Sequence, residues 1–188
     1  SSDKGGQTIQ RSFVIRIIDQ NDFPTDILLS DTTINEIAPI GTRVATITTT
    51  DEDLTDTFTY SLIAGSGDAG NSSFAIVGDE LQSNTTFDYE SQPNYTVRIR
   101  TTDSQGGSFE KTFNIALTNG NEKPSIDPQF FSISENSTPN TIIGTVTASD
   151  MDANETFTFS ILGSQLDFRI DDASGALSSS RTFDYKND

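Results

Sequence analysis

The sequence predicts an all-β protein, built from antiparallel β-sandwiches that follow one another in a linear array. Three observations lead to this fold class. Residue patterns return along the chain at an interval of about 100 residues, which suits one small domain per repeat. Within each repeat, apolar residues alternate with polar ones over short runs, and turn-rich clusters of Gly, Asn and Asp separate these runs. No run shows the period of an amphipathic helix, so strands are expected throughout.

The internal repeat sets the expected domain organisation. The matching residues are Phe13, Ile15 and Ile17 with Phe113, Ile115 and Leu117; Glu36, Asp51 and Asp53 with Glu135, Asp150 and Asp152; and Phe87, Asp88 and Tyr89 with Phe183, Asp184 and Tyr185. We therefore assign residues 1–21 to the C-terminal end of a preceding repeat and 22–121 to a complete repeat. Residues 122–188 form the N-terminal part of a following repeat.

The strands expected within a repeat follow from the two-residue alternation. Tyr95, Val97 and Ile99 face one side of a strand, and their polar neighbours face the other. Residues 113–117 alternate in the same manner, and the Thr-rich run 46–50 also suits a strand. About seven such segments fit into one repeat, a pattern typical of an immunoglobulin-like antiparallel sandwich.

The composition excludes several classes of function. The chain carries 28 Asp and Glu against 11 Lys and Arg, a net charge of −17, so its surface repels nucleic-acid phosphates and anionic lipids. Cys and His are both absent, which excludes disulfides, the usual zinc sites and His-dependent nucleophiles. No stretch approaches the roughly 20 apolar residues of a membrane span. We expect no nucleic-acid partner, no direct membrane contact by this segment, and no catalytic or organic-cofactor site.

Acidic residues gather where the first two repeats meet. The residues concerned are Asp19, Asn21, Asp22, Asp51, Asp53 and Asp103. Calcium takes about six to eight oxygen ligands and tolerates irregular geometry, so acidic loops that converge at a junction could bind it. Without a cation the same carboxylates would repel one another. A solvated turn is an equally good interpretation of any single Asp, but the return of Asp-x-Asp in the next repeat favours calcium.

Taken together, these motifs resemble those of cadherin repeats, in the form common in bacterial and other microbial surface proteins. The family's linker Asp-x-Asn-Asp corresponds to residues 19–22, its first-strand Glu to Glu36 and Glu135, its Asp-x-Asp to residues 51–53 and 150–152, its Asp-Arg-Glu to residues 88–90, and its late Asp to Asp3 and Asp103. The resemblance covers the whole chain and implies calcium shared between adjacent repeats. At the second junction it implies as ligands Glu36, Asp88, Glu90, Asp150 and Asp152, together with the linker residues Asn119, Asn121 and Glu122.

The sequence departs from the cadherin pattern at two places. In the second linker, Asn119 replaces the first Asp and loses a charge, whereas Glu122 replaces the last Asp and reaches further. We therefore expect weaker binding or fewer ions at the second junction. After the last Asp-Tyr pair, Lys186 replaces the family's Glu, which weakens the case for a further site there.

We interpret the chain as a structural or adhesive segment of an extracellular protein at a cell surface, in which Ca2+ at the junctions stiffens a rod for cell adhesion or surface display. Its expected partners are neighbouring repeats of the same protein and a homophilic, protein or glycan partner. The alternative is a carbohydrate- or protein-binding β-sandwich module of a secreted microbial protein, although the chain has no Trp for a sugar platform. Catalysis would need a carboxylate pair such as Asp88 and Glu90, whose repeated motif favours metal binding instead.

The two ends of the sequence carry parts of repeats. We expect the native protein to continue past both of them. The alternative is that the closing strand in residues 1–18 of one molecule docks on the open sandwich of residues 125–188 in the next. Such head-to-tail contacts would build filaments.

Overall fold

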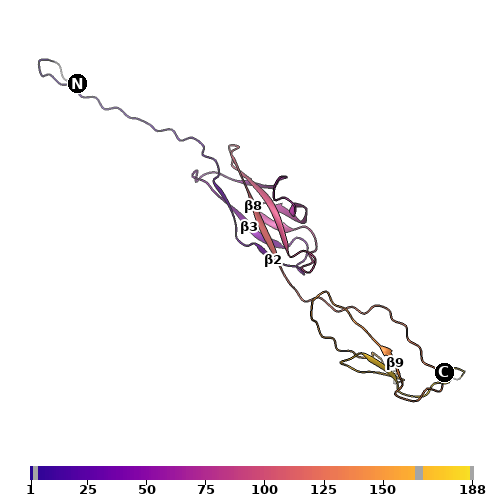
Figure 1. Cartoon of the computed structure of the whole chain (residues 1–188). Helices are drawn as coiled ribbons and strands as arrows, with labels where there is room; N and C mark the ends of the chain where they lie inside the picture. The colour runs from indigo at the N-terminus through magenta and orange to yellow at the C-terminus, as the bar shows by residue number, and fades with distance from the viewer. Residues whose placement is uncertain (2–3, 164–166, 187–188) are drawn as a thin grey trace. The chain divides into compact units, whose positions relative to one another are not determined.

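The computed structural model describes residues 1, 4–163 and 167–186, so Asp3 lies outside the described residues. Nearly all of its regular structure is β (Figure 1). The chain divides into two compact units, each of which is described by itself. The first unit comprises Ser1–Thr33, Ile40–Thr85 and Tyr95–Ile115, and the second comprises Ile34–Pro39, Thr86–Asn94 and Ala116–Asp188.

Two four-stranded sheets form between residues 26 and 118 (Figure 1). The first has the order β1 (Asp26–Leu29), β3 (Arg43–Thr50), β6 (Glu80–Ser83) and β5 (Phe74–Val77). The second has the order β2 (Thr33–Asn35), β8 (Ser108–Thr118), β7 (Asn94–Thr102) and β4 (Thr59–Leu62). The pairs β1–β3, β3–β6, β5–β6 and β4–β7 are antiparallel, as predicted. A short 3-10 helix, η1 (Asn71–Ser73), precedes β5.

Eight strands occupy this region where about seven were expected. The difference arises at the start, where β1 pairs in one sheet and β2 belongs to the other. Between them, the Asp31 carboxylate accepts hydrogen bonds from the backbone N–H groups of Thr32 and Thr33 at 2.6 and 2.9 Å. A side chain that caps its own backbone in this way favours a turn, so one expected strand becomes two.

The buried core draws side chains from both sheets. The fully buried aliphatic residues of the first unit are Ile27, Ile47, Leu81, Val97, Ile99 and Ile115. In β7 the predicted alternation is confirmed, because Val97, Ile99 and Thr101 are buried whereas Arg100 is exposed. Burial of these aliphatic side chains is the main term that stabilises such a domain.

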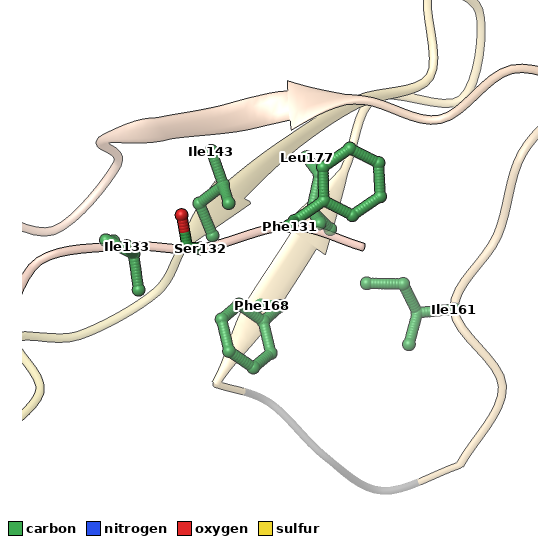
Figure 2. Close-up of a pocket in the computed structure, with 7 residues that line it drawn as sticks. All are labelled: Phe131, Ser132, Ile133, Ile143, Ile161, Phe168 and Leu177. Atoms are coloured by element: carbon green, nitrogen blue, oxygen red, sulfur yellow. The ribbon is translucent and has the colours of Figure 1, made fainter. Parts of the chain in front are cut away.

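The C-terminal part of the second unit contains a three-stranded sheet in the order β10 (Phe168–Ile170), β11 (Ala176–Ser179) and β9 (Ile142–Thr145). Figure 2 shows the apolar groove beside it, of about 340 Å³, lined by Phe131, Ser132, Ile133, Ile143, Ile161, Phe168 and Leu177. Ser125 and Ser149 form an isolated antiparallel bridge. The Ser125 N–H donates to the Ser149 carbonyl at 2.8 Å, as the Thr25 N–H donates to the Thr50 carbonyl one repeat earlier. The repeat read from the sequence is therefore visible in strand pairing.

Residues 10–25 contain no strand, although alternation predicts one at Phe13, Ile15 and Ile17. These three side chains are 86–91% exposed. A lone extended segment gains neither ladder hydrogen bonds nor a buried face, so alternation alone does not define a strand here. Among the described residues, no helix has the length and apolar character needed to cross a membrane.

Candidate metal centres

The first candidate centre lies where three strands of the first unit begin or end. Asp51 directly follows β3, Asp103 directly follows β7, and Asp56 lies shortly before β4. Because β4 and β7 are antiparallel, with Thr59 opposite Thr102, the start of one strand lies beside the end of the other. Each of the three carboxylates contributes one oxygen to a group whose atoms all lie within 4.8 Å of one another.

Three oxygens of this centre are buried and have no hydrogen-bond partner among the described residues. They are Asn21 Oδ1, Asp51 Oδ2 and Asp56 Oδ2. The other side-chain atom of each residue is engaged, because Asn21 Nδ2 donates to Asp103 at 3.2 Å, Asp51 accepts from Asp53 N–H at 3.0 Å, and Asp56 accepts from the Ser104 hydroxyl at 2.8 Å. The protein thus fixes each side chain and leaves one oxygen of each for another ligand.

Asp103 is the most buried of these carboxylates, with 6% of its surface exposed. Burial acts to raise its pKa, but hydrogen bonds from Asn21 and from the backbone N–H groups of Gln105 and Gly107 outweigh burial, and the pKa lies below its ordinary value. The two backbone bonds are both 2.8 Å long. Asp103 is therefore held ionised and in one orientation.

The remaining residues predicted for the first junction have other surroundings. The Asp53 carboxylate accepts a 2.7 Å hydrogen bond from the backbone N–H of Asp22 and is not one of the three clustered residues. The side chains of Asp19 and Asp22 are exposed. Asp56 was not among the predicted ligands, and its position shortly before an expected strand is the signal that would have found it. The predicted ligand set remains a prediction.

The second candidate centre is built around Glu36, which is 4% exposed in the second unit. Its carboxylate accepts hydrogen bonds from the backbone N–H groups of Tyr89 and Gly120, at 2.5 and 2.8 Å. Oxygens of Glu36, Asp88 and Glu90 lie within 4.8 Å of one another. Glu90 accepts a further bond from the side-chain amide of Asn119 at 2.8 Å, so the linker is tied to this carboxylate group.

A second carboxylate group of the same unit comprises Glu122, Asp150 and Asp152. Asp152 accepts from the backbone N–H of Glu122 at 3.0 Å, and Asp150 accepts from the N–H of Asp152 at 3.1 Å. These two bonds repeat those made by Asp22, Asp53 and Asp51 in the first centre. Both linkers are therefore attached to the Asp-x-Asp loop in the same way. The side-chain amide of Asn121 donates to the Glu122 carbonyl at 2.7 Å.

Glu122 joins the two carboxylate groups of the second centre electrostatically. Burial, and then the charges of Glu36, Asp152 and Glu90, raise its pKa above the ordinary value. Its Oε2 is buried and has no hydrogen-bond partner among the described residues. A cation at this position would remove the repulsion and satisfy the oxygen.

A weaker copy of the motif lies near Tyr185, whose backbone N–H donates to Glu135 at 3.2 Å, as Tyr89 donates to Glu36. Glu135 is exposed, whereas Glu36 is buried. No candidate metal group of the described residues includes Glu135.

Comparison with known proteins identifies the family. The cadherin domain matches residues 30–118 and 129–188. The chain therefore belongs to the cadherin domain family, which confirms the cadherin resemblance read from its motifs; the microbial form of the family stays a prediction. Cadherin domains are extracellular modules of a non-enzymatic adhesion family and generally bind calcium. This result favours the adhesive interpretation over the carbohydrate-binding one.

Individual relatives agree with this assignment. Human Protocadherin Fat 1 is 28% identical over 183 residues, a match that covers 90% of this chain and 4% of that protein. The chain thus spans a small part of that relative's length. The protocadherin gammaB7 EC3-6 cis-dimer structure is 25% identical, with a TM-score of 0.50 and coverage of 90% of this chain and 45% of that one. The structure of Human Protocadherin-24 EC1-2 (Form II) has a TM-score of 0.64 and is 20% identical, and the match covers 87% of this chain and 82% of that one. At this identity the likeness shows the fold alone.

Proposed function

We propose that this chain is a calcium-stiffened segment of an extracellular repeat protein that serves cell adhesion or surface display. The observation that carries the proposal is the set of buried, unpartnered oxygens of Asn21, Asp51 and Asp56 beside the carboxylate of Asp103. A buried oxygen without a donor is costly, and a bound cation would take the donor's place. Calcium suits an irregular set of carboxylate and amide oxygens better than smaller ions that require regular geometry.

The ligands of the first centre divide into two classes. Asn21, Asp51, Asp56 and Asp103 would hold the ion directly, on the strength of their clustered or unpartnered oxygens. Asp19, Asp22 and Asp53 are the further ligands that the family's motif implies. The second centre would use Glu36, Asp88, Glu90, Glu122, Asp150 and Asp152, with the linker amides of Asn119 and Asn121 nearby.

The ion would act on stiffness through the linkers. Each linker is tied by one backbone hydrogen bond to an Asp-x-Asp loop, at Asp53 and at Asp152. One such bond contributes only about 1 kcal/mol, too little to prevent bending on its own. A calcium ion that binds linker and strand-end oxygens together would cross-link them, and its loss would leave repelling carboxylates around a hinge.

The partners follow from this role. Neighbouring repeats of the same protein share each junction. A homophilic, protein or glycan partner at a cell surface would complete the adhesive function. The solved structure of the gammaB7 relative is a cis-dimer, which supports a homophilic partner among these three kinds.

Titration calorimetry with calcium, combined with thermal melting and small-angle scattering, tests the proposal. We expect dissociation constants of roughly 10⁻⁴ to 10⁻³ M, as for extracellular calcium modules. Calcium at about thirty times the dissociation constant should stabilise the fold by about 2 kcal/mol. It should also increase the maximum particle dimension obtained from small-angle scattering. Magnesium at equal concentration is the control for screening of the −17 charge. Identical melting and scattering in calcium, magnesium and chelator would refute the proposal.

A further inference from the structure

A partly buried hydroxyl network bridges the two sheets of the first unit beside the first candidate metal centre. The Thr49 hydroxyl on β3 donates to the Tyr60 hydroxyl on β4 at 3.1 Å. It also lies 2.7 Å from the hydroxyl of Thr101 on β7. Thr101 is fully buried, and it lies directly opposite Tyr60 in the β4–β7 register. Thr49 therefore connects one sheet to two neighbouring strands of the other.

Two residues of the network have the same spacing in the sequence from a carboxylate of the first centre. Thr49 precedes Asp51 by two residues, and Thr101 precedes Asp103 by two residues. Side chains two residues apart on a strand face the same side. The hydroxyl contact thus lies on the next-to-last residues of β3 and β7, two residues before the carboxylates that directly follow these strands.

We propose that Thr49, Thr101 and Tyr60 are positioning residues, which set the separation of Asp51 and Asp103 and so pre-organise the first centre for a divalent cation. This inference rests on the proposed calcium binding. Without an ion, the two carboxylates repel each other and push the ends of β3 and β7 apart. Apolar contacts between sheets are non-directional and resist such sliding weakly, whereas the partly buried 2.7 Å hydrogen bond between Thr49 and Thr101 has a narrow optimum of distance and angle.

The following repeat lacks this network. The residues that match Thr49 and Tyr60 are Ala148 and Phe159, neither of which has a hydroxyl. Asp150, the counterpart of Asp51, therefore has no such support from these two positions. The second centre serves as an internal control, because changes to the network should leave its calcium affinity unaltered.

The test compares Thr49→Val, which keeps the shape and removes the hydroxyl, with Thr49→Ser, which keeps the hydroxyl. Calcium is titrated into the ¹⁵N-labelled full chain. The amide of Gly107, which donates to Asp103, reports on the first centre, and the amide of Gly120, which donates to Glu36, reports on the second. Because Thr49 acts on Asp51 only through the strand, we expect Thr49→Val to raise the dissociation constant read at Gly107 by at most about tenfold, the low end of the effect of partners that hydrogen-bond a ligand directly. Thr49→Ser should stay within about twofold of the wild type. The value read at Gly120 should not change.

A purely structural role gives a different result. In that case Thr49→Val lowers the melting temperature of the ion-free protein while the affinity read at Gly107 stays at the wild-type value, which overturns the inference and leaves the proposed function intact. If the wild-type chain shows no calcium-dependent shift at Gly107, the proposed function fails at this centre and the inference fails with it. Tyr60→Phe removes one of the two hydrogen bonds and should act in the same direction by a smaller factor. If Thr49→Val does not fold, the dissociation constant of Tyr60→Phe read at Gly107 tests the inference instead.

Discussion

The two candidate metal centres share a backbone framework and differ in how their carboxylates are held. In the first, hydrogen bonds from Asn21 and from backbone N–H groups keep the pKa of Asp103 below its ordinary value. In the second, burial and neighbouring carboxylates raise the pKa of Glu122. The same repeated motif therefore gives one centre whose charge is stabilised by the protein and one whose charges oppose each other until a cation binds.

The two linker residues have different surroundings. Asp22 and Glu122 occupy the same place, and each donates its backbone N–H to the second Asp of an Asp-x-Asp loop. The Asp22 side chain is exposed, whereas the longer side chain of Glu122 ends in a buried, unpartnered oxygen. The Glu122 side chain lies close to the charges of Glu36 and Glu90, whereas the matching carboxylates of the first junction would belong to the preceding repeat.

The largest expected effect comes from removing a clustered carboxylate of the first centre. Asp51→Asn replaces one carboxylate oxygen, either the unpartnered Oδ2 or Oδ1, by an NH2 group. This group is only a hydrogen-bond donor and cannot bind a cation. We expect calcium affinity at the first centre to fall by about 10- to 100-fold, with no change at the second. Calorimetric titration measures both.

The matched control for this prediction is Asp79→Asn, which makes the same chemical change at an exposed turn outside both centres. Asp53→Asn should have a smaller effect than Asp51→Asn, since an amide oxygen can still accept the backbone bond from Asp22. Equal losses from all three variants would mean that net charge, and not these ligands, controls binding.

A somewhat smaller effect is expected at Asp56, the residue that motif reasoning missed. One of its oxygens already accepts from Ser104, and the other is unpartnered. Asp56→Asn should weaken calcium at the first centre by about tenfold, because one direct ligand loses its charge. The same titration with Glu52→Asn, an exposed neighbour, supplies the control. Equal affinities for the two variants would remove Asp56 from the centre.

The sequence predicted most of the fold, because two-residue alternation and the repeat are local signals. It did not predict the division into β1 and β2, which depends on hydrogen bonds that Asp31 makes to its own backbone. It also assigned a strand near Phe13, where alternation is present but the described residues form no strand. Periodicity records which residues can face a core, and pairing decides whether a strand forms.

The candidate centres were only partly predictable from the sequence. The motif assigned Asp51 and Asp103 to the same junction. In the structure each directly follows a long strand. It could not separate Asp53, which binds the linker backbone, from Asp56, which joins the cluster, because that choice depends on the path of the loop before β4. The expectation of fewer or weaker ions at the second centre stays a prediction.

The smallest and most diagnostic effect concerns pH and Glu122. A carboxyl whose pKa is raised by folding contributes stability below its unfolded-state pKa, and this contribution is lost as the pH rises through the folded-state pKa. Glu122→Gln cannot ionise and keeps its contribution at neutral pH. In chelator, the urea midpoint of this variant should match the wild type at about pH 4 and exceed it at about pH 7. Saturating calcium should reverse the order at pH 7, because the ion then stabilises the wild-type carboxylate and gains less from an amide. Glu52→Gln changes the net charge equally on an exposed side chain and separates this local repulsion from the general repulsion of a chain with a charge of −17. If both Gln variants shift the midpoint alike at pH 7, or if calcium leaves their order unchanged, the raised pKa of Glu122 does not distinguish the second centre from the first.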